Sequence, residues 1–163
     1  QNAPAFFGRG LTADAIRELV LQHPNIQLMK GEGPVVDIAG LIERTEGRVP
    51  VFNGRGGLEL VDNLRAGCRG MILAPDCIDH AVVAYEAFRR GDEEAAERAY
   101  QAMLPAAVFS MQGIENLLCY GKRLFGARAG IDIHDRAPAL RPVAAGEAMV
   151  ARFAKALGPL GGL

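Results

Sequence analysis

The chain has 163 residues, of which half are hydrophobic, and its formal net charge is −1. This length is enough for one domain with a real core, and the near-neutral charge argues against nucleic acid as a partner. No apolar run approaches the length of a membrane span, and no signal peptide is visible. Three cysteines without metal-ligand spacing predict neither a disulfide framework nor a metal site, and they favour a reducing cytoplasm.

Helical and strand patterns alternate through the first part of the chain. Thr12 is a candidate N-cap for a helix that ends at His23-Pro24. Short apolar runs then start about 21 to 23 residues apart, and amphipathic helical spacing separates them. The predicted strands are residues 26–29, 49–52 and 70–74.

Repeated βα units predict parallel strands that are joined by right-handed crossovers through the helices. The fold class is therefore α/β, as either an open doubly wound sheet or a TIM (β/α)₈ barrel, and the short αβ loops favour the barrel. A closed barrel needs roughly 200 residues or more. The strands here, including a fourth if Gln1-Asn2 ends one, predict the second half of a barrel. The chain also starts with Gln rather than Met, as expected for a piece of a longer polypeptide.

The pattern changes after Pro75, where the predicted strands stop. A helix is expected over 79–90, a second from Asp92 to a kink or restart at Pro105, a third over 111–125 and a last one over 144–157. The tail from Gly158 is expected to be mobile. The predicted domains are thus the barrel half, 1–77, and the last barrel helix with a C-terminal helical extension, 78–163. Such an extension covers a barrel or forms an oligomer interface.

Lys30 is the first candidate catalytic residue. It follows the apolar run Ile26–Met29 and precedes the glycine-rich Gly31–Pro34. Burial disfavours the ammonium form of a lysine, which frees an amine that can attack a carbonyl and form a Schiff base. The alternative is a lysine at a strand end whose head extends into water.

Other polar residues would meet Lys30 at the C-terminal edge of a barrel, where barrel active sites lie. Asn53-Gly54-Arg55 is followed by two more glycines, so this segment either binds an anion or forms a tight turn. Glu32 could pair with Lys30 or relay a proton, although a solvated loop carboxylate is the preferred interpretation. Asp132–Asp135, which contains His134, superficially resembles a ligand cluster, but neighbouring residues of an extended segment point in opposite directions. No metal site is predicted.

Taken together, these segments resemble the C-terminal half of the dihydrodipicolinate synthase/N-acetylneuraminate lyase family. Gln1-Asn2-Ala3-Pro4 with Gly8 is similar to the family's Tyr-Asn-x-Pro-x-Arg-Thr-Gly segment. His23–Lys30 is similar to the strand that carries the Schiff-base lysine, Asn53-Gly54 falls where the family has Ser-Gly, and Gly70–Ile72 falls on the eighth strand. The resemblance implies that Lys30 and the Gln1 position are catalytic, and that Gly54 and Ile72 line the keto-acid pocket.

Two departures separate the chain from the family pattern. Gln1 stands where the family has its proton-relay tyrosine, and an amide cannot serve as a general acid or base as a phenol can. Phe6 stands at the arginine that binds the substrate carboxylate, and Phe7 at the following threonine. A true dihydrodipicolinate synthase is therefore not expected. Arg55 could supply the missing substrate-binding cation from another strand.

The resemblance implies a cofactor-independent lyase whose Lys30 imine with pyruvate or another 2-keto acid supports aldol-type cleavage, condensation or dehydration of a keto sugar acid. One alternative is a non-catalytic relative that binds a keto acid or sugar acid, and another is an unrelated open α/β module in which Lys30 is structural. Half a barrel leaves open sheet edges, so we expect a homodimer or homotetramer rather than a free monomer, in the cytoplasm, with no membrane partner.

Overall fold

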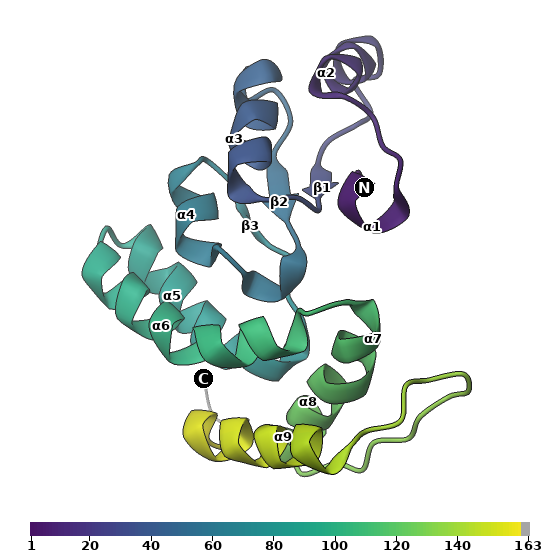
Figure 1. Ribbon diagram of the computed structural model, residues 1–163. Helices are drawn as coiled ribbons and strands as arrows, with labels where there is room; N and C mark the ends of the chain where they lie inside the picture. Colours follow the sequence, from purple (N-terminus) through teal and green to yellow (C-terminus); the bar gives the residue numbers. More distant parts are fainter. Residues whose placement is uncertain (161–163) are drawn as a thin grey trace. The chain divides into compact units, whose positions relative to one another are not determined.

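A computed structural model describes residues 1–160 of the chain, and for Ala5 and Phe6 it describes the backbone alone. The chain divides into two compact units, Gln1–Leu73 and Ala74–Leu163. The boundary predicted after residue 77 falls just inside the second unit, at the end of the 3₁₀ turn η2 (Pro75–Cys77). Each unit is described by itself (Figure 1).

The first unit is built from βα repeats. Its three strands form one parallel sheet in the order β1-β2-β3. Asn2 adds a parallel bridge to Gly31 on the free side of β1, which is the fourth strand position expected for Gln1-Asn2. The elements in chain order are α1 (Pro4–Phe7), α2 (Ala13–Gln22), β1 (Met29–Gly31), α3 (Val35–Arg44), β2 (Val51–Asn53), η1 (Arg55–Gly57), α4 (Leu60–Arg65) and β3 (Gly70–Met71).

Local chemistry explains where these elements begin and end. The Thr12 hydroxyl accepts the N–H of Ala15 at 3.2 Å and caps α2 as predicted. β2 begins after Pro50, which has no N–H to give to a ladder. β1 begins later than predicted and continues through Gly31, because Gly31 pairs with Asn53 on one side and bridges Asn2 on the other. Lys30 therefore lies inside the strand.

The two faces of the sheet differ. Met29 and Val51 belong to a buried apolar cluster with Ile16 of α2 and with Ile38 and Leu41 of α3, and Figure 1 shows α3 and α4 on one side of the strands. Successive residues of a strand point to opposite faces. Lys30 follows Met29 in β1, and its register partner Phe52 follows Val51 in β2. Both therefore lie on the other face of the sheet, where they are half-buried.

The second unit is helical, and most of its helices are where the sequence predicts them. The Asp92 carboxylate caps α6 by accepting the N–H of Ala95 at 2.9 Å. Among the residues that the structure describes, no helix is long and apolar enough to cross a membrane. The elements are α5 (Ile78–Arg89), α6 (Glu93–Ser110), α7 (Ile114–Asn116), the π-helical segment η3 (Leu117–Gly121), α8 (Lys122–Ala129) and α9 (Ala144–Leu157).

Three expectations for this unit need correction. α6 continues through Pro105 to Ser110, so the predicted restart does not occur. Buried Met103, Ala106 and Ala107 pack the helix on both sides of the hydrogen bond that proline cannot donate. The helix expected over 111–125 is divided into α7, η3 and α8. The start of the predicted mobile tail is ordered, since Leu160 donates its N–H to the Arg128 carbonyl at 2.9 Å. Residues 161–163 lie outside the described part.

Arg128 holds both ends of the second unit together. Its side chain is fully buried. Its guanidinium donates to the carbonyls of Leu157 and Gly158 at the end of α9, to the Asp76 carbonyl in η2, and to both carboxylate oxygens of Asp79 in α5. These five contacts satisfy every N–H that an arginine side chain carries. A buried charge that is paired and fully hydrogen-bonded in this way is structural.

Candidate functional site

Lys30 lies at the centre of a row of residues across the sheet. Its register partner in β2 is Phe52, and the Asn2–Gly31 bridge places Gln1 at the position next to Lys30 on the opposite side. The Asn2 N–H donates to the Lys30 carbonyl at 3.0 Å. The lysine side chain is 25% exposed, and its Nζ lies 2.5 Å from Oε1 of Glu32. Most of the lysine is thus enclosed, while its amine contacts one carboxylate.

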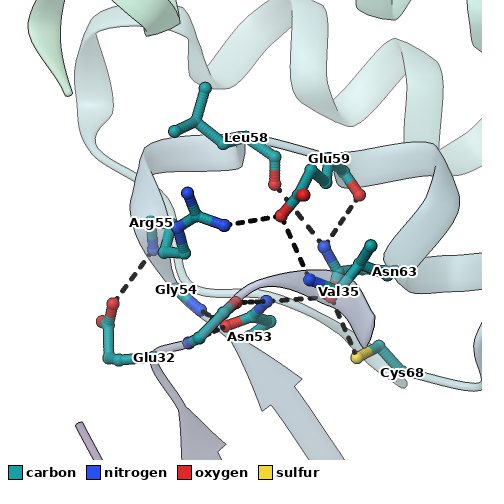
Figure 2. Close-up of polar contacts among 10 residues, drawn as sticks. Glu32, Val35, Asn53, Gly54, Arg55, Leu58, Glu59, Asn63 and Cys68 are labelled. Carbon is teal, nitrogen blue, oxygen red and sulfur yellow. Dashed lines mark hydrogen bonds and ion pairs between the residues drawn. The ribbon is translucent and has the colours of Figure 1, made fainter. Parts of the chain in front are cut away.

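Glu32 is buried, with 8% of its surface exposed, so the interpretation of this residue as a solvated loop carboxylate was wrong. It follows Lys30 by two residues, and side chains with this spacing along an extended segment point to the same side. Its second carboxylate oxygen, Oε2, accepts the backbone N–H of Arg55 at 3.1 Å (Figure 2). Glu32 therefore bridges the lysine amine and the loop after β2.

Gly54 provides the space for the Glu32 carboxylate. A Cβ at position 54 would lie 2.0 Å from Glu32 Oε1, closer than any real contact. The next residue, Arg55, has a left-handed backbone with φ of 60°, and its N–H donates to Oε2 of the same carboxylate. The loop was expected to bind an anion or to form a tight turn, and the structure shows the turn, the 3₁₀ segment η1. The Arg55 N–H at its start is already bonded to the carboxylate of Glu32, and binding of an external anion stays a prediction.

The buried side-chain amides of Asn53 and Asn63 hold the loop after β2 in place. Asn53 Nδ2 donates to the Gly33 carbonyl and to Asn63 Oδ1, both at 2.9 Å, and its Oδ1 accepts the Gly54 N–H at 2.8 Å. Asn63 of α4 donates in turn to the Glu59 carbonyl at 2.8 Å. Figure 2 shows the amides in a continuous chain beneath the loop. Both asparagines are fully buried, so the two glycine-rich segments are held to each other rigidly.

The guanidinium of Arg55 points away from Glu32. Its Nη1 lies 2.6 Å from Oε2 of Glu59, and the same oxygen accepts the Val35 N–H at 3.2 Å (Figure 2). The predicted role of Arg55 in binding a substrate carboxylate stays a prediction, and it would require the guanidinium to share or leave Glu59. The cation is therefore not free in this arrangement.

The remaining predicted site residues lie around the same edge. The Ile72 N–H donates to the Asn53 carbonyl at 2.7 Å, which continues the pairing of β3 with β2, and the Ile72 side chain is exposed. Gln1 is exposed as well. Gln1, Lys30 and Gly54 thus lie at or next to the C-terminal ends of neighbouring strands of the sheet. The side chain of Phe6, at the family's arginine position, is outside the described part.

The three cysteines are not placed for nucleophilic chemistry. All three cysteines are free and buried, and burial raises the pKa of the Cys68 thiol to about 11 and that of Cys77 to about 12. Such thiols are inert at neutral pH. Within residues 1–160, no group of three or more potential ligands is arranged to hold a metal ion.

Sequence reasoning considered the Glu32–Lys30 contact but did not prefer it, and it missed Asn63, the partner of Asn53. The pairing of Glu32 with Lys30 was indicated by their spacing of two residues on an extended segment, together with glycines at positions 31, 33 and 54. The Asn53–Asn63 amide pair joins a strand end to the next helix, and no local pattern distinguishes it from ordinary turn residues. Only the packing of α4 against the sheet brings it together.

The chain is similar to solved structures of the dihydrodipicolinate synthase family. It matches a prophage protein of this family from Escherichia coli K12, solved in complex with pyruvate, at 22% sequence identity with a TM-score of 0.83. A putative dihydrodipicolinate synthetase from Pseudomonas aeruginosa matches at 25% identity and a TM-score of 0.84. Dihydrodipicolinate synthase from Rhodopseudomonas palustris matches at 20% identity and a TM-score of 0.84.

Each of these matches covers 96% of this chain but 54% of the other, so the chain spans about half the length of the structures that it matches. The predicted fold, the second half of a (β/α)₈ barrel with its helical extension, is confirmed. The alternative of an unrelated open α/β module does not agree with these matches. Neither the models of protein families nor the curated protein sequences gave a match.

Proposed function

We propose, from a fold that is half of a dihydrodipicolinate synthase-type barrel, that this chain carries the Schiff-base lysine of a lyase. Lys30 would form an imine with pyruvate or another 2-keto acid. The imine would support aldol-type C–C cleavage or condensation, or dehydration of a keto sugar acid. The observation that carries the proposal is the half-buried Lys30 amine in contact with a buried carboxylate at the edge where the parallel strands end.

The chemistry needs an amine nucleophile and then an electron sink. The neutral amine attacks the keto carbon, the carbinolamine loses water, and the protonated imine withdraws electrons from the bond that breaks or forms. No cofactor is required for these steps. The pyruvate complex of the Escherichia coli relative supports a 2-keto acid as the substrate class.

The residue at the Gln1 position favours a substrate other than that of dihydrodipicolinate synthase. An amide can hydrogen-bond a substrate oxygen, but it cannot transfer a proton as a phenol does. The same observation supports the second candidate function, a non-catalytic protein that binds a keto acid or sugar acid. The two candidates differ in turnover, not in imine formation.

Borohydride reduction of the full-length natural polypeptide with pyruvate tests both candidates. Covalent mass gain on Lys30 in a peptide map, together with turnover of a keto sugar acid, supports the lyase. Mass gain without turnover of any 2-keto acid or sugar acid supports the binding protein. A Lys30→Arg variant is the control, because it keeps the charge and removes the nucleophile. Equal labelling of this control would contradict the proposal.

Arg55 provides a separate test of substrate binding. If its guanidinium binds an acidic substrate, Arg55→Ala should raise KM by about 10-fold or more while leaving borohydride trapping on Lys30 intact. Arg65→Ala is a suitable control, since Arg65 is an exposed residue of α4 paired with Asp62. An unchanged KM would remove Arg55 from the binding site.

We propose further that the active form is a homodimer or homotetramer of the full-length polypeptide in the cytoplasm. The three free, buried cysteines agree with a reducing compartment. One similar solved structure, at 14% identity, is described as the first monomeric variant of dihydrodipicolinate synthase, so a monomer is also compatible with this fold. Light scattering on the purified full-length polypeptide gives the subunit number.

A further inference from the structure

We propose that Glu32 is the group that moves protons to and from Lys30, in the role that the tyrosine would have at the Gln1 position. This inference rests on the proposed function, since it concerns the formation of the Lys30 imine. Glu32 accepts the proton of the lysine ammonium, and then delivers a proton to the hydroxyl that leaves the carbinolamine. Glu32 would be a catalytic residue, because it contacts the reacting amine.

The contact geometry carries the proposal. Oε1 of Glu32 lies 2.5 Å from Lys30 Nζ, so the two groups are in direct contact and a proton can pass between them without a bridging water. Among the described residues, no other carboxylate forms an ion pair with Lys30 Nζ. The neighbouring Glu59 instead accepts bonds from Arg55 and Val35. Glu32 is therefore the acid–base group that the structure offers to the amine.

The surroundings hold the carboxylate in one orientation. Oε2 is bound by the Arg55 N–H, so Oε1 faces the amine. The carboxylate occupies the space of the side chain that Gly54 lacks, and the Asn53–Asn63 amides fix the backbone of Gly33 and Gly54 on either side of it. A group that is fixed in this way needs no rearrangement at the moment of reaction. An exposed carboxylate that only pairs with a lysine needs neither a bound second oxygen nor a glycine that makes room for it.

The proton balance of the step is closed. Lys30 ammonium gives one proton to Glu32, and the neutral nitrogen forms a bond to the keto carbon while the carbonyl oxygen takes up the second nitrogen proton. Glu32 then protonates the resulting hydroxyl, the C–O bond breaks, and water leaves. The nitrogen lone pair forms the protonated imine, and Glu32 is again a carboxylate. No oxidant, reductant or further reactant is needed.

Glu32→Gln is the main test, since it keeps the size and hydrogen-bonding ability of the side chain but cannot carry a proton. The rate of Lys30 imine formation with pyruvate, followed by rapid quench with borohydride and mass spectrometry, should fall about 10²-fold or more. The final extent of trapping should stay near that of the wild type. Glu43→Gln, an exposed carboxylate of α3, is the matched control and should react at the wild-type rate.

Two further variants keep the proposal testable if Glu32→Gln does not fold. Glu32→Ala should be slow but accelerated by added formate, which can occupy the vacated space and carry the proton. Gly54→Ala should slow imine formation without a substitution at residue 32, because its Cβ would lie 2.0 Å from Oε1 and push the carboxylate away from the amine. Circular dichroism checks that each variant is folded.

The outcomes separate this inference from the proposed function. If wild-type Lys30 is never trapped, the Schiff-base function itself is wrong. If the wild type is trapped and Glu32→Gln, or the folded Glu32→Ala without formate, reacts at the wild-type rate, the function stands and the role of Glu32 is overturned. Slow imine formation that formate restores supports Glu32 as the proton carrier.

Discussion

The two units each contain an ion pair removed from water, and the pairs differ in how completely they are bonded. In the second unit, Arg128 and Asp79 form a bidentate pair, and three carbonyls take the remaining guanidinium N–H groups. In the first unit, Lys30 contacts Glu32, and a quarter of the lysine side chain is exposed. An ammonium carries three donors, so this amine has capacity left over.

This difference distinguishes a charged side chain that stabilises the fold from one that can react with a ligand. A saturated pair has nothing left to offer a ligand, and its value lies in the segments that it joins. An incompletely bonded pair at a sheet edge leaves an amine available to a small molecule. The same type of contact therefore has different consequences in the two units, and substitutions can test the difference in order of expected effect.

The largest effect is expected from Arg128→Met. It removes every bond of the guanidinium and leaves the half-buried Asp79 carboxylate without a partner, which typically costs about 3–5 kcal/mol of unfolding free energy. Urea unfolding followed by circular dichroism measures the loss. Arg98→Ala, which breaks an exposed pair with Glu94, is the control and should change the unfolding free energy little. Equal effects of the two variants would contradict a structural role for Arg128.

Gly146→Ala should have the next largest effect. A Cβ at this position of α9 would lie 2.3 Å from the Tyr120 ring, so the ring or the helix must move. Overpacking of this kind costs about 1–3 kcal/mol. A Cβ at Gly40 of α3 would instead meet no atom within 4 Å, and Gly40→Ala should stabilise by about 0.5–1 kcal/mol. Thermal unfolding of both variants shows whether the signs are opposite.

Lys30→Gln should have a smaller effect on stability than either of these destabilising changes. The amide can still donate to Glu32, and the site is partly open to solvent, so the expected loss is below about 1 kcal/mol. Borohydride labelling at this position should nevertheless disappear. A loss of stability as large as that of Arg128→Met would show that the Lys30–Glu32 pair is also a structural clamp.

The smallest expected effect is the pH dependence of the unfolding free energy that Asp76 causes, and Asp79 of the same unit provides the contrast. Burial raises the pKa of Asp76, although Ser110 donates to its carboxylate at 2.9 Å. Burial also opposes ionisation of Asp79, but the hydrogen bonds from Arg128 outweigh it and lower its pKa. Because the folded state raises the pKa of Asp76, its stabilising contribution is present below the unfolded pKa and is lost as pH rises through the folded pKa.

Asp76→Asn should therefore be more stable than the wild type near neutral pH, and the two should converge as the pH falls below the usual aspartate pKa. Urea unfolding at a series of pH values measures the difference. Asp132→Asn, in the exposed loop, should run parallel to the wild type. A gain for Asp76→Asn that is independent of pH would show that the carboxylate is not the cause.

The sequence predicts those elements whose signals are local. Thr12 and Asp92 cap their helices as expected, and α9 covers the predicted residues 144–157. β1 and β2 begin later than their apolar runs, and β3 begins at residue 70 as predicted but ends at Met71. These bounds differ because pairing with a neighbour defines a strand and hydrophobicity alone does not. The continuation of α6 through Pro105 depends on tertiary packing, which local propensity does not contain.

The candidate site was predictable to a similar degree. Lys30 and the loop at Gly54 are apparent from their position after apolar runs. The Glu32 contact depends on the absence of a side chain at Gly54, in the loop after β2. The Asn53–Asn63 pair depends on the packing of α4 against the sheet. Arg128 gave no sequence signal, because its five acceptors come from three separate segments of the second unit.

The bonding of Arg128 has a consequence for proteolysis. Trypsin cleaves after arginine only where the backbone can enter its active site, and residue 128 lies in α8 with its side chain enclosed. Arg136 lies in the exposed segment between α8 and α9. The native protein should therefore be cut at Arg136 first, as exposed loops are. A cut after Arg128 would appear only when α8 and α9 separate, so this peptide bond reports the opening of the helical unit.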